Sequence, residues 1–234
     1  MRFKRKDETG RKSAGITYAE AVDAQRRLAR RVVPEFPHMK VRTVAGADVA
    51  FARDGRVAIA GFVAFSWPKL EIVDVSVAAA ESTFPYIPGL LSFREIPVLA
   101  KAFKRLSARP DVLFCDAHGR AHPRRFGLAS HLGVVLAMPT IGCAKSILVG
   151  EVARLGAKRG SSARIVDTGE TVGKALRTRD NVKPLYVSTG NMMDIATAVR
   201  MVLAAARGYR IPEPTRQAHI LVSAVKRMIE EDEG

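Results

Sequence analysis

Apolar and polar positions divide the chain into an early helix, a group of strands, and then alternating strands and helices. Apolar residues recur at helical spacing over residues 17–32, which open with Thr17 and Glu20 at the spacing of a capping box. Three β-rich apolar runs follow at residues 43–51, 56–67 and 70–79. The Asp54-Gly55 pair between the first two runs is typical of a hairpin turn. This half of the chain therefore predicts one helix followed by antiparallel strands.

The second half predicts short strands that alternate with helices. Residues 91–106 have helical spacing, but Pro97 would remove a backbone hydrogen bond, so we expect the regular helix to start near Ile96. Further helices are predicted at residues 123–137, 193–206 and 215–231, and strands at 111–115, 140–144, 165–175 and 185–188. Residues 151–165 are rich in glycine, lysine and arginine and predict a surface loop. The whole order predicts an α/β fold with a mixed central sheet and helices on both faces.

Length and charge narrow the class of protein. At 234 residues the chain fits a single domain, which we place at residues 16–234 after a basic tail at residues 1–15. The net charge of +15 favours a polyanionic partner such as nucleic acid, with a solvated basic surface as the alternative. Cys115 and Cys143 lie in apolar runs and suit a reducing cytoplasm better than a disulfide. We expect no membrane segment or signal peptide, and a monomer.

Acidic residues occur in or after two of the predicted strands. Asp48 lies inside one apolar strand, and Asp116 directly follows another. A carboxylate in such a place costs several kcal/mol unless it is paired or binds a cation. Two such acids in a basic chain favour a Mg²⁺ site, with pairing to a buried arginine or capping of a turn as the alternative. Acids at strand ends in this order match a ribonuclease H-like fold, although the order alone also fits other three-layer α/β folds.

Glu95 is the third candidate ligand. Ser92 and Glu95 have the spacing of a capping box, in which Glu95 would only satisfy a backbone N–H group. Pro97 would then fall inside the helix and delete a hydrogen bond, which argues against capping. We therefore favour Glu95 as a metal ligand.

Histidine and lysine side chains could complete a site around these acids. His118 and His122 flank the turn after Asp116 and could reach a phosphate or an attacking water. Lys145 ends a predicted strand and could stabilise charge on a phosphate, with a surface lysine as the alternative. His131 lies on an apolar helical face and is interpreted as structural, and His219 alone would be assigned to solvent. The spacing of cysteines and histidines does not indicate zinc.

The segment Pro85-Tyr86-Ile87-Pro88-Gly89 combines two prolines with a glycine. The prolines fix φ and the glycine allows a tight turn, so the tip is stiff. Apolar tips of this kind can enter a base step and unstack it, and an enzyme that acts on one abnormal base must gain access to that base. The alternative is a surface loop that buries its aromatic side chain in the core.

These motifs together resemble the endonuclease V family of deoxyinosine 3′ endonucleases. The resemblance runs from about Val41 to His219 and rests on AGADVAF, PYIPGLLSFREIP, DAHGRAHPRRFGLASHLG, PTIGCAKS and PEPTRQAH. It implies a ribonuclease H-like fold and a Mg²⁺-dependent site, with Mn²⁺ as a second possible metal. It also implies DNA repair by hydrolysis of the second phosphodiester bond 3′ to a deoxyinosine in single- or double-stranded DNA, leaving a 3′-hydroxyl and a 5′-phosphate.

The resemblance also assigns roles by motif position. It implies that Asp48, Glu95 and Asp116 hold the metal and that His122, Lys145 and His219 assist catalysis. It implies a strand-separating wedge at Pro85, Tyr86, Ile87 and Pro88. The pocket for the flipped base would be lined by Gly89, Leu91, Gly119 and Gly127.

Two positions depart from the family pattern. Ala117 stands where glycine is usual after the strand aspartate, and its Cβ could tighten the base pocket. Asn191 stands where histidine is common, and no role is carried over to it. Two rival functions stay open at this point: an inosine-directed ribonuclease that acts on RNA, and a non-catalytic nucleic-acid-binding module.

Overall fold

The computed structural model describes residues 16–231, so the predicted basic tail lies outside the described residues. One mixed sheet runs through the molecule in the order β3-β2-β1-β4-β5-β9-β8-β7-β6. The strands are β1 (Thr43–Ala52), β2 (Val57–Ser66), β3 (Ile72–Glu81), β4 (Val112–Cys115), β5 (Thr140–Ala144), β6 (Glu151–Val152), β7 (Ser162–Asp167), β8 (Glu170–Leu176) and β9 (Leu185–Thr189). The helices are α1 (Tyr18–Ala29), α2 (Leu91–Lys104), α3 (Leu128–Leu136), α4 (Ile195–Ala205) and α5 (Glu213–Glu231), with a short turn η1 (Arg53–Gly55) between β1 and β2.

The centre of the sheet is parallel and its two flanks are antiparallel. β4 runs parallel to both of its neighbours, β1 and β5, while β2 and β3 form an antiparallel meander on one side, and β9, β8, β7 and β6 continue antiparallel on the other. The predicted hairpin turn at Asp54-Gly55 is present, with φ values of 54° and 87°. The predicted mixed sheet is therefore confirmed.

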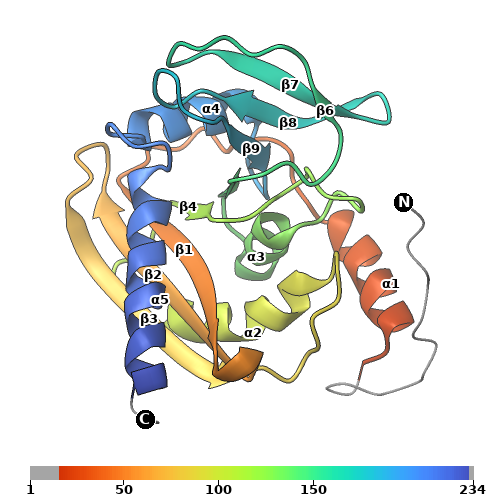
Figure 1. Ribbon diagram of the computed structural model, residues 1–234, viewed down its shortest axis with the longest axis vertical. Coiled ribbons are helices and arrows are strands. Elements are labelled where there is room, and N and C mark those ends of the chain that lie inside the picture. The colour runs from red at the N-terminus through yellow and green to blue at the C-terminus, as the bar shows by residue number, and fades with distance from the viewer. Residues whose placement is uncertain (1–15, 232–234) are drawn as a thin grey trace.

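Helices cover both faces of this sheet (Figure 1). Alternate residues of β1 point to opposite faces: Ala45 packs in a cluster with residues of α2 and α3, and Val44 packs in a cluster with residues of α4. α5 lies across β1 and β2 on the face that carries α4 (Figure 1). Gly46 permits this close approach, because a Cβ there would lie 1.8 Å from the Pro214 carbonyl oxygen. The approach brings the start of α5 over the middle of β1.

The first helix begins as the sequence predicts. Thr17 and Glu20 form a complete capping box, and α1 ends at Ala29, three residues before the predicted end. α1 stands at the edge of the molecule beside α3 (Figure 1). None of the helices between residues 16 and 231 is long and apolar enough to cross a membrane.

Four predictions of local structure were wrong. The surface loop predicted at residues 151–165 contains β6 and the first residues of β7, which pair with each other. α2 begins at Leu91 rather than near Ile96, and Pro97 lies inside it on the exposed face, where water can hydrate the carbonyl group left without a donor. Residues 123–127 form a turn, because Arg125 has a φ of 56°, which an α-helix does not allow. The strand predicted at 165–175 is a hairpin, in which Thr168 and Gly169 at φ values of 50° and 82° separate β7 from β8.

Candidate active site

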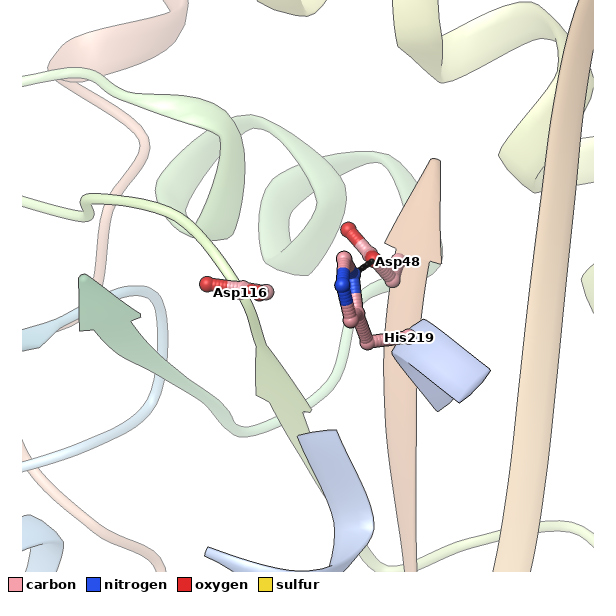
Figure 2. Close-up of side chains that lie close together, drawn as sticks. All are labelled: Asp48, Asp116 and His219. Atoms are coloured by element: carbon pink, nitrogen blue, oxygen red, sulfur yellow. Dashed lines mark hydrogen bonds and ion pairs between the residues drawn. The ribbon is translucent and has the colours of Figure 1, made fainter. Parts of the chain in front are cut away.

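The two strand acids meet because their strands are parallel neighbours. Ala47 of β1 is paired with Cys115 of β4, so Asp48 and Asp116 are the next residues along each strand. The Asp116 amide donates to the Ala47 carbonyl at 3.2 Å, which extends the register to the aspartates. A ligand atom of each aspartate and one of His219 all lie within 4.8 Å of one another (Figure 2). The sheet register therefore builds the centre of the site.

A histidine and a lysine contact the two aspartates. His219 on α5 places its Nδ1 2.8 Å from Asp48 Oδ2, although its side chain is 55% exposed. Lys145, directly after β5, places its Nζ 2.5 Å from Asp116 Oδ2. β5 is the parallel neighbour of β4, and this order sets the ammonium group beside the acid. His219 is exposed, as the sequence alone indicated, but its ring also contacts Asp48, because α5 folds back over β1.

Glu95 is a buried acid that feels the charges of both aspartates, with 7% of its surface exposed. Burial, together with the charges of Asp48 and Asp116, raises the pKa of Glu95 to about 8 against the opposing effect of Arg94. The capping box with Ser92 does not form, because Leu90 is the N-cap and the Ser92 hydroxyl pairs with His131 Nδ1 at 2.9 Å. Among the described residues, the closest group of ligand atoms contains Asp48, Asp116 and His219 without Glu95. Its role as a third ligand stays a prediction.

The donor set fits a hard divalent cation. Burial and the charge of Asp116 raise the pKa of Asp48, with His219 acting in the opposite direction. Two carboxylates at this separation repel each other when both are ionised, and a cation between them removes that cost. Carboxylate oxygens are the protein ligands that Mg²⁺ and similar cations prefer. The site is therefore an acidic cluster with the properties of a metal site.

His118, His122 and His131 are neutral side chains in partly or fully buried places. Burial lowers the pKa of His118 to about 4 and that of His122 to about 4, with nearby arginines adding to the effect at His122. His122 Nδ1 accepts from the Arg124 amide at 3.2 Å. A hydrogen bond with the Gly89 backbone acts in the opposite direction and raises the pKa of His122. His122 therefore lies against the base of the predicted wedge. His131 is 5% exposed between Phe93 and Phe126, which confirms its structural interpretation.

The predicted wedge is an exposed tip on a buried base. Tyr86 is 66% exposed, whereas Phe84 is 7% exposed and packs with Ala21 and Leu90. Ile87 is partly buried against the same cluster. The buried-aromatic alternative thus describes Phe84 and is wrong for Tyr86. Gly89 closes the tip with a φ of 80°, which glycine adopts without strain.

The predicted pocket residues lie on closely packed backbone. The Gly127 amide donates to the Gly119 carbonyl at 2.9 Å. A Cβ on Gly119 would lie 2.1 Å from the Thr189 oxygen, and one on Gly127 would lie 2.4 Å from the His118 oxygen. Only glycine fits at either position. Leu91 is 37% exposed at the start of α2.

Two structural residues had not been assigned from the sequence. Asn191 is buried, accepts from the Val33 amide at 2.9 Å and donates to the Gly133 carbonyl at 3.0 Å. Arg125 pairs with Asp167 at 2.7 Å and with Glu170 at 2.7 Å, and so holds the turn after His122 against β7 and β8. Asn191 follows Ser188, Thr189 and Gly190 in a polar stretch, which gave no signal that its side chain is buried. The signal for Arg125 was its place in the HPRRFG motif.

A ribonuclease H-like sheet with paired aspartates on neighbouring parallel strands, flanked by a lysine and a histidine, defines the class of metal-dependent nucleases. Within that class, the endonuclease V family model matches residues 26–220, and the chain belongs to the endonuclease V family. The endonuclease V of Myxococcus xanthus is 48% identical over 213 residues, which cover 91% of each chain. The endonuclease V of Methanothrix thermoacetophila is 50% identical, over 89% of this chain and 92% of its own.

Solved structures of the family share the whole fold. The endonuclease V of Streptomyces avermitilis is 41% identical, with a TM-score of 0.86 over 93% of this chain and 95% of its own. The catalytic domain of human endonuclease V is 36% identical, with a TM-score of 0.84 over 90% of this chain and 96% of its own. The Ciona intestinalis endonuclease V is 28% identical, with a TM-score of 0.80 over 91% of this chain and 98% of its own. That structure is a complex with DNA that contains an inosine followed by a ribo-adenosine.

Proposed function

We propose that the protein is a DNA repair endonuclease that recognises deoxyinosine and hydrolyses the second phosphodiester bond on its 3′ side. The observation that carries the proposal is the meeting of Asp48, Asp116, Lys145 and His219 at the centre of the sheet. The inosine-containing DNA bound by the Ciona relative supports the choice of substrate. The net charge of +15 suits a nucleic-acid partner.

The acids would hold the metal and the basic groups would manage charge around it. Asp48, Asp116 and Glu95 are the proposed ligands of Mg²⁺, with Mn²⁺ as a second metal that the same oxygens would accept. The bound metal would supply a Lewis acid that activates water and neutralises charge on the phosphate. Lys145 is close enough to Asp116 to donate to the same phosphate oxygens. His219 orients Asp48 through its Nδ1.

The exposed tip and the glycine-lined loop would give access to the base. Tyr86 with Pro85, Ile87 and Pro88 would enter the base step beside the deoxyinosine. The flipped hypoxanthine would then lie against Gly89, Leu91, Gly119 and Gly127, with the neutral His122 nearby. Ala117 adds its Cβ at the edge of this region, where it packs against the core. A monomer in a reducing cytoplasm stays a prediction, and the two buried free cysteines support the reducing compartment.

An inosine-directed ribonuclease is the second candidate. The ribo-adenosine after the inosine in the Ciona complex supports it, because that relative accommodates a ribonucleotide next to the modified base. A cut in RNA would need the same metal site, so the two candidates differ in whether the site accepts ribose or deoxyribose around the modified base.

The test is nicking of an end-labelled duplex with one deoxyinosine, beside an unmodified duplex and an inosine-containing RNA. We expect a Mg²⁺-dependent cut one nucleotide beyond the deoxyinosine and none in EDTA. Asp48→Asn and Asp116→Asn should abolish the cut and keep binding of the modified duplex. Asp180→Asn is the matched control, because Asp180 bonds only to Lys158 and Arg159 among the contacts described for its side chain.

The outcomes separate the candidates. Cutting of RNA alone would assign the protein to the ribonuclease. Loss of binding together with cutting in both aspartate variants would give these acids a structural role and contradict the proposed metal site.

A further inference from the structure

Gln25 is a fully buried amide on the helix that precedes the sheet. It lies on α1 and none of its surface is exposed. The same face of α1 carries Ala21, one turn earlier, which packs with Phe84 and Leu90 at the base of the predicted wedge. Burial of an amide costs free energy unless its donors and acceptor find partners. The hydrogen-bond partners of Gln25 therefore show which segments α1 connects.

Each hydrogen-bonding group of Gln25 is used. Its Nε2 donates to the Gly89 carbonyl at 3.0 Å and to the Phe126 carbonyl at 2.9 Å. Its Oε1 accepts from Arg124 Nε. Arg124 also donates from Nη2 to the Gly89 carbonyl at 2.6 Å. One side chain thus joins two segments, the end of the wedge and the loop after His122, which are distant in sequence.

These two segments need such a connection. Gly89 has a φ of 80° and is a point where the chain could pivot. On one side of this glycine lies the exposed tip of the wedge at Tyr86. The loop after His122 is a turn without helical hydrogen bonds until α3 starts at Leu128. A wedge and a pocket that must act on the same nucleotide work only at a fixed separation.

We propose that Gln25 is a positioning residue that fixes the wedge tip relative to the loop lining the base pocket, and thereby sets discrimination for the modified base in duplex DNA. This inference rests on the proposed function. Gln25 is buried and acts through Gly89 and Arg124 rather than through contact with DNA. Helix α1 then contributes to recognition of the modified base, although the family match begins only at residue 26.

The test uses two variants and a matched glutamine. Gln25→Leu keeps the approximate volume and removes all three hydrogen bonds, and Gln25→Glu keeps an acceptor for Arg124 and removes both amide donors. Gln217→Leu is the control, because Gln217 donates to Glu213 within α5 and joins no distant segments through that bond. Thermal unfolding of each variant sets a temperature at which all are folded.

Two measurements follow on the full chain. Amide hydrogen exchange of the protein alone should become about tenfold faster at residues 84–90 and 119–127 in both Gln25 variants, because both remove the two amide donor bonds that join these segments. The ratio of single-turnover cleavage of a deoxyinosine duplex to that of the same single strand should fall about tenfold, because only the duplex needs the wedge. Gln217→Leu should change neither.

Several results would overturn the inference. Unchanged exchange in the two segments removes the mechanical connection. Faster exchange with an unchanged duplex-to-single-strand ratio removes its role in discrimination, and equal loss on both substrates reduces Gln25 to a structural residue. If the wild type does not cut deoxyinosine DNA, the proposed function fails, while the exchange measurement still decides whether Gln25 connects the segments.

Discussion

The substitution Glu95→Gln separates the burial of Glu95 from its predicted role as a ligand. In the metal-free protein the pKa of Glu95 rises from 4.5 to about 8, chiefly because the side chain is buried. The folded state then holds a proton that the unfolded state has lost over this range, so the free energy of unfolding falls as pH rises through it. A pKa difference of this size corresponds to up to about 5 kcal/mol at about 1.4 kcal/mol per pH unit. This decrease in the free energy of unfolding is complete only above about pH 8.

The amide introduced by Glu95→Gln resembles the protonated acid and does not titrate. We therefore expect the variant to match the wild type near pH 5 and to be more stable by a few kcal/mol near pH 8 in EDTA. Urea unfolding of both proteins at a series of pH values measures this difference. His118, His122 and His131 have lowered pKa values, which cost stability as pH falls below about 6.5. That cost is the same in both proteins, so it cancels when the variant is compared with the wild type. Glu81→Gln, at an exposed strand end, is the control.

Added Mg²⁺ should reverse the difference, because a cation would favour the ionised Glu95 of the wild type and gain nothing from the amide. Parallel stability curves in EDTA would refute the effect of burial on Glu95. A difference that Mg²⁺ leaves unchanged would refute its role as a ligand.

Three further substitutions test neighbouring parts of the site. Lys145→Met should lower the single-turnover cleavage rate about 100-fold with little effect on DNA binding, and an equal loss of binding would assign Lys145 to a general phosphate contact. Tyr86→Ala should leave the melting temperature unchanged, because Tyr86 is 66% exposed, and should reduce cleavage of duplex more than of single strand by about tenfold. A large drop in melting temperature would mean that Tyr86 belongs to the core. Gly127→Ala should lower the melting temperature strongly, because its Cβ would meet backbone at 2.4 Å, whereas Gly169→Ala meets nothing within 4 Å and should cost about 1 kcal/mol for its left-handed backbone. Equal effects of the two alanine variants would contradict this packing argument.

The sequence predicted the strands that carry the acids better than it predicted how the acids meet. Apolar runs around Asp48 and before Asp116 were sufficient to place both residues on strands. Their proximity depends on β1 and β4 being parallel neighbours, and periodicity in sequence carries no information about which strands pair. Lys145 reaches Asp116 for the same reason, because β5 lies next to β4. Only the resemblance to a family grouped Asp48, Asp116, Lys145 and His219 in one site before the structure was known.

The wrong local predictions have a common cause in backbone geometry that residue patterns only partly encode. Thr168-Gly169 is a turn signal inside an otherwise β-rich stretch, and it was outweighed by the length of that stretch. Arg125 has a positive φ, which its side-chain contacts to Asp167 and Glu170 hold in place. Those partners lie 42 and 45 residues away, so no local rule would have ended the helix there.

Polar residues at positions that the pattern assigns to the core were the signal left unused. Gln25 follows Ala21 by one helical turn and shares its buried face, where an apolar side chain would be the ordinary choice. Because a buried amide must be satisfied, its presence predicts a specific partner even though the sequence does not name it. The partners Gly89 and Phe126 lie 64 and 101 residues away. Asn191 is another buried amide, and its side chain joins the segment after α1 to α3, but it lies in a polar stretch rather than at a patterned core position. Such positions mark connections between segments, and in this fold the connection made by Gln25 reaches the wedge.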